Sequence, residues 1–366
     1  MKKAVLFTRH YFSHQSRKTT VHFVARQLAT RGYDVSFVSV GRSRLATSLK
    51  AKSRIPTDIK RDVFTELEPM IHSIVLDEMV HPLSSRSGLV NCLLSPKVLK
   101  YGTRIPSVIA AHVKQADLIL IECGYGVAYF DALKAMAPKA KFVYLATDPL
   151  GEVGLRPEFE EMENQALPKF DLVRVAAPEF ADRFPKDTKS VVIPQGIDKS
   201  IFDRIMTSPY PDGSVNLVSV GDMSFDEDSL IQMAQAAPQA TLHVFGARFH
   251  QDTPANIKVH GEVEFSKLAP YIKFADAGIM PYKLTENMGY LKHTSLKFLQ
   301  YTYCGLPILT AQGIDWGRAC VFTYDRSNAA SIHAATRDAI AHGQDSNLSK
   351  SIVDWSEVTE RLLGAL

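Results

Sequence analysis

The sequence has 366 residues, of which 46% are hydrophobic and 22% are charged, and its formal net charge is +3. This length is enough for two domains of ordinary size, each with its own core. So small a positive charge does not by itself indicate a nucleic-acid-binding protein. No stretch approaches the ~18 uninterrupted apolar residues of a membrane-spanning helix.

The basic residues are concentrated in about the first sixty positions. This bias suits an anionic membrane surface or a pyrophosphate-bearing acceptor, and it equally suits a solvated basic face. The apolar run near the N-terminus ends at Thr8 and is too short for a signal-peptide core. The four cysteines show no metal-binding or disulfide spacing and predict free thiols. We expect a cytoplasmic protein, with the membrane surface as its place of contact.

The first half of the chain alternates strands and helices. Strands are predicted over 4–8, 35–40, 118–122, 141–146 and 172–175, and helices over 20–31, 106–115, 127–136, 157–167 and 178–184. Residues 41–100 show the least regular pattern. The strand–loop–helix–strand opening predicts a doubly wound sheet, whose ligands lie at the carboxyl ends of the strands. Because no GxGxxG follows the first strand, a dinucleotide-dependent dehydrogenase is disfavoured.

The segment 207–214, TSPYPDGS, has the composition of a linker. A second α/β series follows it, with strands over 216–220, 241–245, 258–260, 277–280 and 308–310, and helices over 228–236, 266–274, 293–304, 329–342 and 355–363. We therefore predict an α/β fold of two Rossmann-like, doubly wound domains. The predicted domains are 1–206, 207–345 and a C-terminal helical segment, 346–366, that packs back toward the first domain.

The predicted helix over 293–304 carries the strongest functional signal. One face is apolar at spacings of three and four: Leu296, Leu299 and Tyr303. Three polar side chains lie in its first turns: Ser295, Lys297 and Gln300. Free backbone N–H groups and the helix dipole favour an anion at this end of a helix. These residues predict either a phosphate site or an ordinary solvated face.

Two acidic motifs offer further chemistry. Asp148 follows a predicted buried strand, so it is either a general base at the rim of a cleft or a turn former in Thr-Asp-Pro. Asp226-Glu227-Asp228 has the D-x-D spacing of a metal site, but at a strand-to-helix junction it predicts a helix N-cap. The histidines show no paired spacing. We expect no metal.

Several runs, taken in order, resemble a known family. They are HFVARQLATRG, FVYLATDPLG, VIPQGID, VSVGDMSFD, VHGEVEF, YIKFADAGIMPY, YLKHTSLKFLQY and the Gly-Leu-Pro that follows. Together they resemble GT-B glycosyltransferases, and more closely the family of the membrane-associated β-glucuronosyltransferase of xanthan biosynthesis. The resemblance covers the whole chain.

The resemblance implies a role for each matching residue. Asp148 corresponds to the general base. Met223 corresponds to the position beside the nucleotide base, and Gln300 to the contact with the ribose. The other implied donor-binding residues are Glu262, Tyr282, Tyr290, Leu291, Ser295, Leu296 and Lys297. Leu296 stands where the family has Met, a change that conserves volume. Retaining GT-B enzymes carry two glutamates where this chain has Lys292 and Gln300, which favours inversion.

The resemblance implies an inverting, metal-independent and cofactor-free transfer of a sugar, glucuronic acid, from a UDP-sugar to a polyprenyl-pyrophosphate-linked oligosaccharide in exopolysaccharide assembly. The enzyme would sit on the inner face of the cell membrane. Candidate residues for the acceptor or membrane are Arg17, Lys18, His81 and Arg86. The alternatives are a UDP-sugar 2-epimerase, a solute-binding module and a non-catalytic GT-B partner subunit that binds the nucleotide sugar. Loss of turnover with retained UDP binding in Asp148→Asn would separate an enzyme from the two binding proteins.

Overall fold

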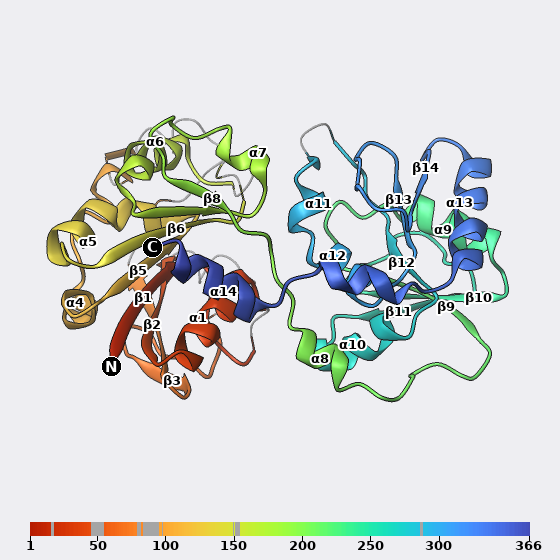
Figure 1. The fold of residues 1–366 in the computed structure, drawn as a ribbon, viewed down its shortest axis with the longest axis horizontal. Helices are drawn as coiled ribbons and strands as arrows, with labels where there is room; N and C mark the ends of the chain where they lie inside the picture. The colour runs from red at the N-terminus through yellow and green to blue at the C-terminus, as the bar shows by residue number, and fades with distance from the viewer. Residues whose placement is uncertain are drawn as a thin grey trace. The chain divides into compact units, whose positions relative to one another are not determined.

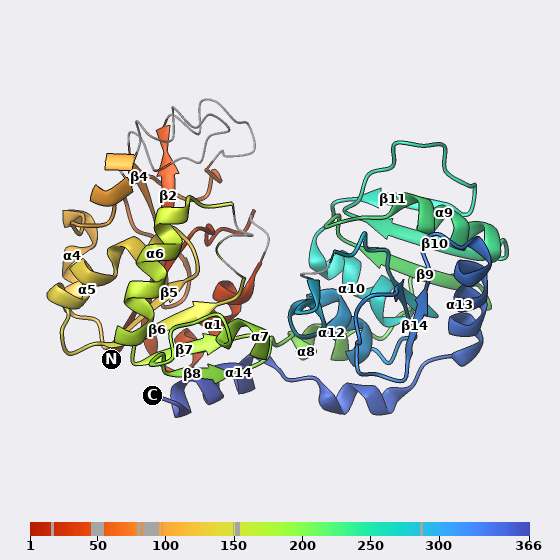
Figure 2. The same ribbon diagram turned by 90° about the horizontal axis from the view of Figure 1, so that it is seen from above.

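A computed structural model describes residues 1–15, 18–44, 55–78, 82, 95–96, 98–148, 150, 154–285 and 288–366. The chain forms two compact units (Figure 1). Unit 1 comprises Met1–Pro194 and Trp355–Leu366, and unit 2 comprises Gln195–Asp354. Each unit is a parallel-rich sheet with helices packed on it, as expected for a Rossmann-like domain (Figure 2).

The strands of unit 1 lie in the order β3-β4-β2-β1-β5-β6-β7-β8. Their bounds are β1 Lys2–Thr8, β2 Tyr33–Ser43, β3 Thr65–Glu68, β4 Ile71–Glu78, β5 Leu118–Glu122, β6 Lys141–Ala146, β7 Leu172–Val175 and β8 Ser190–Val192. All neighbours are parallel except β3 and β4. The central strands β5 and β6 are buried along nearly their whole length because helices cover both faces of the sheet.

The order of the strands in unit 1 reverses beside β1. The chain runs from β1 to β2 on one side and later returns to place β5 on the other side. In a doubly wound sheet the crevice for a ligand opens at such a reversal, outside the carboxyl ends of the two strands. Thr8 ends β1 and Glu122 ends β5. These two residues therefore mark the expected position of the unit 1 site.

The helices of unit 1 include the C-terminal one. They are α1 Thr20–Thr30, α4 Ser107–Lys114, η2 Tyr125–Tyr129, α5 Phe130–Met136, α6 Pro157–Ala166, η4 Leu167–Lys169, α7 Pro178–Ala181 and α14 Trp355–Gly364. The Phe23 and Trp355 rings stack with centroids 5.1 Å apart. The guanidinium of Arg31 donates to the Ser356 carbonyl oxygen at 2.9 Å. These contacts hold α14 against α1 (Figure 1).

The strands of unit 2 are all parallel and lie in the order β11-β10-β9-β12-β13-β14. Their bounds are β9 Val215–Val220, β10 Ala240–Phe245, β11 Ile257–Gly261, β12 Ala277–Met280, β13 Ile308–Ala311 and β14 Val321–Tyr324. The helices are α8 Lys199–Asp203, α9 Glu227–Ala236, α10 Phe265–Lys273, α11 Leu291–Thr294, α12 Leu296–Tyr303, α13 Ala329–His342 and η6 Ser346–Ser351. Helices α9 and α13 lie side by side (Figure 2). The strand order reverses between β9 and β12.

The division of the chain differs from the expected one. Residues 195–206, expected in the first domain, lie in unit 2, as do residues 346–354. Helix α8 is held there because the Lys273 ammonium on α10 donates to the carbonyl oxygens of Phe202 and Ile205, each at 2.8 Å. The expected linker 207–214 is a loop within unit 2, anchored by the Tyr210 hydroxyl, which donates to the Tyr271 carbonyl oxygen at 2.6 Å.

The helix expected over 293–304 is broken into α11 and α12 at Ser295. Ser295 has extended backbone angles, φ −68° and ψ 106°, and its hydroxyl accepts a hydrogen bond from the Phe298 backbone N–H at 3.4 Å. The break shifts the apolar face of the helix, so Leu296 and Tyr303 are only partly buried. Its core side chains are Phe298, Leu299, Tyr301 and Thr302.

Candidate active site

Lys297 lies at the carboxyl ends of β9 and β12 in unit 2. Its ammonium donates to the carbonyl oxygen of Val220, the last residue of β9, at 2.9 Å. The same ammonium lies 4.3 Å from the centroid of the Tyr282 ring, just past β12. Lys297 thus bridges the two strands between which the sheet order reverses. Burial lowers the pKa of this ammonium to about 8, an effect that the nearby Asp222 carboxylate partly offsets.

The N-terminus of α12 opens beside this ammonium. Ser295 caps the helix, and its hydroxyl also lies 3.2 Å from the buried Tyr282 hydroxyl. The Ser295 hydroxyl accepts from the Phe298 N–H, while the first N–H groups of a helix in general have no partner within the helix and point toward its N-terminal end. A partial positive charge from the helix and a full charge from Lys297 therefore meet at one place. This arrangement favours a phosphate or diphosphate group.

The loops after β9 and β12 are fastened to each other. The Asp226 backbone N–H donates to the Pro281 carbonyl oxygen, and the Lys283 N–H donates to the Ser224 carbonyl oxygen, each at 2.7 Å. Phe225 and Tyr282 form an isolated antiparallel bridge. The exposed Met223 lies within the first loop. It therefore stands on the same edge of the sheet as Tyr282 and Lys297.

The other expected donor residues have less uniform positions. Glu262 is exposed just past the end of β11, two strands from β9. Tyr290 precedes α11 and is partly buried, whereas Leu291 belongs to the core of unit 2. Leu296 and Gln300 are partly buried on α12. Contacts thus join Tyr282, Ser295 and Lys297 directly, and the donor-binding roles of all these residues stay predictions.

The D-x-D motif takes part in an ion pair within unit 2. Asp226 holds the N-cap position of α9, as expected, but its carboxylate accepts no backbone hydrogen bond there. It accepts instead from the Ser229 hydroxyl at 2.7 Å and from the Arg326 guanidinium at 2.5 Å. A carboxylate engaged in this way serves the local structure.

Asp148 follows Thr147 at the carboxyl end of β6 in unit 1 and is partly exposed. The Thr147 hydroxyl lies 3.0 Å from the buried Cys123 thiol at the end of the neighbouring strand β5. Burial raises the pKa of that thiol to about 12, with further upward contributions from Glu122 and Asp148. Cys123 is therefore a neutral packing residue, and Asp148 is a partly exposed carboxylate on this edge.

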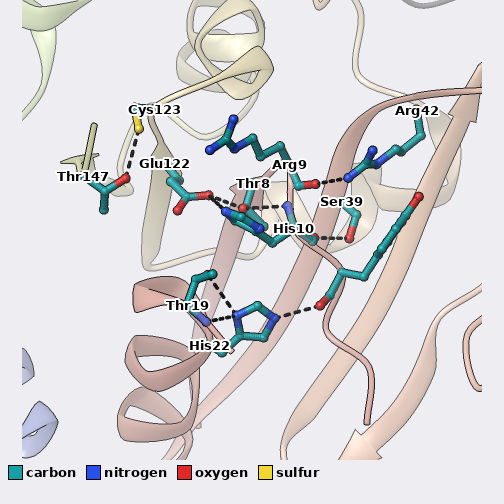
Figure 3. Close-up of polar contacts among 11 residues, drawn as sticks. Thr8, Arg9, His10, Thr19, His22, Ser39, Arg42, Glu122, Cys123 and Thr147 are labelled. Atoms are coloured by element: carbon teal, nitrogen blue, oxygen red, sulfur yellow. Dashed lines mark hydrogen bonds and ion pairs between the residues drawn. The ribbon is translucent and has the colours of Figure 1, made fainter. Parts of the chain in front are cut away.

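Glu122 is a buried carboxyl group that the sequence did not single out. Its carboxylate accepts a hydrogen bond from the Thr8 hydroxyl across the β1–β5 crevice and lies 3.7 Å from Nε2 of His10 (Figure 3). Burial raises its pKa to about 7, the Thr8 hydrogen bond and Arg9 oppose that rise, and Asp148 adds to it. A carboxyl group with this pKa is about half protonated at neutral pH and repels a second carboxylate less than a fully ionised group would.

Glu122→Gln should change how the stability of unit 1 depends on pH. The folded protein keeps the Glu122 proton up to about pH 7, whereas the unfolded chain releases it near pH 4.5. Folded wild type therefore binds the extra proton in this interval, and its stability falls by roughly 2–3 kcal/mol as the pH rises through it. Glutamine has no such proton. We expect the stability of the variant relative to wild type to increase by this amount between about pH 5 and about pH 8.

The two tryptophans allow this measurement, because Trp316 lies in unit 2 and Trp355 lies in unit 1. With Trp316→Phe as the common background, Trp355 fluorescence in urea follows unit 1 alone. A stability difference that is the same at both pH values would contradict the raised pKa of Glu122.

Arg9, His10 and Arg42 are also absent from the residues expected at the site. They line a cavity of about 350 Å³ beside β1 and β2, together with Gly41, Tyr125, Gly154 and Leu155. A signal was present, since Arg9 and His10 directly follow an apolar strand, where polar residues of doubly wound sheets meet ligands. Arg42 carries no such signal, because it lies on a strand predicted to end at residue 40.

The expected acceptor residues are only partly covered by the structure. Lys18 bends back onto its own loop, where its ammonium donates to the Ser13 carbonyl oxygen at 2.5 Å and lies 5.4 Å from the Phe12 ring centroid. Burial lowers its pKa. Arg17, His81 and Arg86 lie outside the described residues. In the parts of the chain that the structure describes, no helix is long and apolar enough to cross a membrane.

Comparison with known proteins adds independent evidence. Residues 6–176 match the family model of the N-terminal domain of glucuronosyltransferase GumK. The UDP-glucuronate:glycolipid 2-beta-glucuronosyltransferase of Xanthomonas campestris pv. campestris is 28% identical over 349 residues, which cover 95% of this chain and 86% of that protein.

Solved structures resemble the whole chain in fold. The structure described as trehalose-6-phosphate from E. coli bound with UDP-2-fluoro glucose matches with a TM-score of 0.63 and 10% identity, covering 99% of this chain and 98% of that one. AviGT4, a glycosyltransferase involved in avilamycin A biosynthesis, matches with a TM-score of 0.56 and 11% identity, covering 100% and 96%.

Two α/β units, each with polar groups gathered at its sheet reversal, and these similarities define a glycosyltransferase of the GT-B fold. Among glycosyltransferases, the chain resembles the glucuronosyltransferase GumK in particular. The predictions of the fold, of an enzyme of this class and of this resemblance are confirmed.

Proposed function

We propose that this enzyme transfers a glucuronosyl group from UDP-glucuronate to a glycolipid, with inversion at the anomeric carbon. The activity of the 28%-identical relative from Xanthomonas campestris supports this donor and this kind of acceptor. The observation that carries the proposal is the Lys297 ammonium, 2.9 Å from the Val220 carbonyl oxygen, beside the capped N-terminus of α12.

In the proposed complex, unit 2 binds UDP. The diphosphate would lie against the α12 N-terminus and Lys297, which counters the charge that grows on the leaving group. The residues around the diphosphate would be Tyr282, Tyr290, Leu291, Ser295 and Leu296. Gln300 would contact the ribose, and Met223 would lie beside the uracil. Glu262 would add a polar contact. Because protein groups supply the positive charge, we propose that neither a metal nor another cofactor is needed.

Asp148 is the proposed general base. The acceptor hydroxyl oxygen bonds to the anomeric carbon on the face opposite UDP, and Asp148 takes the hydroxyl proton. The bond from the anomeric carbon to the UDP oxygen breaks, and its electron pair leaves with the diphosphate. An α-linked donor then gives a β-linked product. The absence of carboxylates at Lys292 and Gln300 supports inversion over retention.

The proposed acceptor is an oligosaccharide on polyprenyl pyrophosphate, used in exopolysaccharide assembly at the inner face of the cell membrane. The basic N-terminal sequence supports contact with an anionic surface through unit 1. Arg17, Lys18, His81 and Arg86 remain candidates for this contact or for the acceptor.

The proposal is tested by measuring UDP release from a panel of UDP-sugars with a lipid-linked oligosaccharide acceptor, in buffer with and without EDTA. We expect turnover with UDP-glucuronate that EDTA leaves unchanged, and a β-linked glucuronosyl product by NMR. Turnover with a different UDP-sugar alone would refute the proposed donor. An α-linked product would refute inversion, and loss of activity in EDTA would refute metal independence.

A further inference from the structure

Unit 1 contains a basic cavity that the proposed chemistry leaves unused. Its volume is about 350 Å³, near the lower end of the roughly 300–1,000 Å³ of small-molecule sites. Arg9, His10 and Arg42 supply its polar lining. One wall is fixed by the Tyr125 ring, which packs so closely on Gly41 that a Cβ there would lie 2.1 Å from a ring carbon. The cavity is thus a formed feature of the unit.

The two arginines of this cavity form no ion pair within the part of the chain that the structure describes. Arg26, Arg44, Arg61 and Arg156 of the same unit each pair with a carboxylate. Within the described residues, neither Arg9 nor Arg42 has a carboxylate partner within ion-pair distance. Arg42 donates to the Arg9 carbonyl oxygen at 2.5 Å, and its buried Nε finds no acceptor in the described part of the chain (Figure 3).

Arg42 is nevertheless held in place. Its guanidinium carbon lies 4.5 Å from the centroid of the Tyr11 ring. A guanidinium stacked on a ring and bonded to a backbone carbonyl keeps little rotational freedom, so little more is lost when it binds an anion. An arginine fixed in this way, with no carboxylate partner among the described residues, is prepared for a ligand.

The pKa of His10 reflects the positive electrostatic potential of the cavity. Burial, together with electrostatic repulsion from Arg9, His22 and Arg42, lowers its pKa to about 3. The imidazole is therefore neutral at pH 7. Its backbone is fixed, because its N–H donates to the Thr8 hydroxyl at 3.0 Å and its carbonyl oxygen accepts from the Ser39 hydroxyl at 2.7 Å. His10 can offer a hydrogen bond to a ligand in a field that favours anions.

We propose that this cavity binds the diphosphate group of the lipid-linked acceptor, with Arg9 and Arg42 as its main ligands. This inference rests on the proposed function. A diphosphate carries more than one negative charge and presents pairs of oxygens that match guanidinium geometry, which suits the two arginines of this cavity. The cavity has room for such a head group, and the lipid chain would extend outside it.

The position of the cavity fits this assignment. It lies at the ends of β1 and β2, while Asp148 follows β6 on the same carboxyl edge of the sheet. The reacting hydroxyl of the acceptor is separated from its diphosphate by the intervening sugars. One acceptor molecule could therefore place its diphosphate at the arginines and its terminal sugar at Asp148.

Calorimetric titration tests the site directly. Inorganic pyrophosphate is titrated into the full-length protein with UDP at saturation, so that the unit 2 site is occupied. We expect Arg9→Gln and Arg42→Gln to weaken binding by about 10-fold or more, and Arg9→Lys and Arg42→Lys to weaken it less. Arg183→Gln removes an exposed arginine elsewhere in unit 1 and should bind like wild type. Equal binding by all five variants, or none by wild type, would overturn the proposal.

Steady-state kinetics of the transfer reaction show which substrate anion the cavity binds. If the cavity holds the acceptor diphosphate, the Gln variants should raise the KM for the lipid-linked acceptor about 10-fold and leave the KM for UDP-glucuronate unchanged. Loss of the preference for UDP-glucuronate over UDP-glucose, with an unchanged acceptor KM, would assign the arginines to the donor carboxylate and overturn the proposal. Failure of UDP to bind would count against the proposed function. The pyrophosphate titration tests the cavity separately, because it does not depend on turnover. If Arg42→Gln fails to fold, Arg9→Gln carries the test.

Discussion

Replacing Asp148 with Asn should lower glucuronosyl transfer by about 10²–10⁴-fold, the range that a positioned general base contributes. Asparagine keeps the shape of the side chain at the end of β6 but cannot take a proton from the acceptor hydroxyl. UDP binds to unit 2 in the proposed complex, and Asp148 belongs to unit 1. The affinity for UDP should therefore remain within about 2-fold of wild type. Initial rates with UDP-glucuronate and calorimetry with UDP measure the two quantities.

Asp187→Asn is the matched control for this prediction. Asp187 is an exposed carboxylate of the same unit, between α7 and β8, and its substitution changes the net charge by the same amount. It should transfer at the wild-type rate. If Asp148→Asn retained a rate within a few-fold of this control, Asp148 would not be the base, and its position at the strand end would reflect turn formation alone.

Hydropathy located most of the strands because each is a short apolar run bounded by polar residues. The strands over 118–122, 141–146, 172–175 and 277–280 and the helix over 329–342 have the predicted bounds. Strands β3 and β4 were missed because they lie in 41–100, where the pattern is least regular, and β14 was missed as well.

Features that depend on distant contacts could not be predicted in this way. Glu122 stands at the end of a predicted strand, but its raised pKa depends on burial and on Thr8, 114 residues away in the sequence. The place of α8 in unit 2 depends on Lys273, about seventy residues later. Ser295 is different, since the break it makes in the helix is local, and serine is a common N-cap residue.

Lys297→Met should weaken UDP binding by about 10-fold or more and lower kcat by about 10²–10³-fold, the cost of removing one preorganised group that stabilises charge in a transition state. Methionine has a similar length and fills the same space above Tyr282. It carries no charge to counter the diphosphate in either the bound or the leaving state. Calorimetry with UDP and saturation kinetics with UDP-glucuronate separate the loss of binding from the loss in kcat.

The pH dependence of UDP binding gives this prediction a second, independent test. Burial lowers the pKa of Lys297 to about 8, so the ammonium of the free enzyme loses its proton as the pH rises through that value. Only the charged form attracts the diphosphate, and the affinity of wild type should fall by up to about 10-fold for each pH unit above about 8. Lys297→Arg keeps its charge, because the pKa of a guanidinium exceeds about 12, and its affinity should stay level over the same range.

Lys267→Met is the matched control, because it removes an exposed lysine of unit 2 from α10. It should show wild-type affinity and the wild-type fall above pH ~8. The assignment of Lys297 would be wrong if Lys297→Met bound UDP as tightly as this control. It would also be wrong if Lys297→Arg lost affinity with rising pH as wild type does, since the titrating group would then lie elsewhere. The predicted pattern ties the diphosphate to one ammonium at the sheet reversal of unit 2.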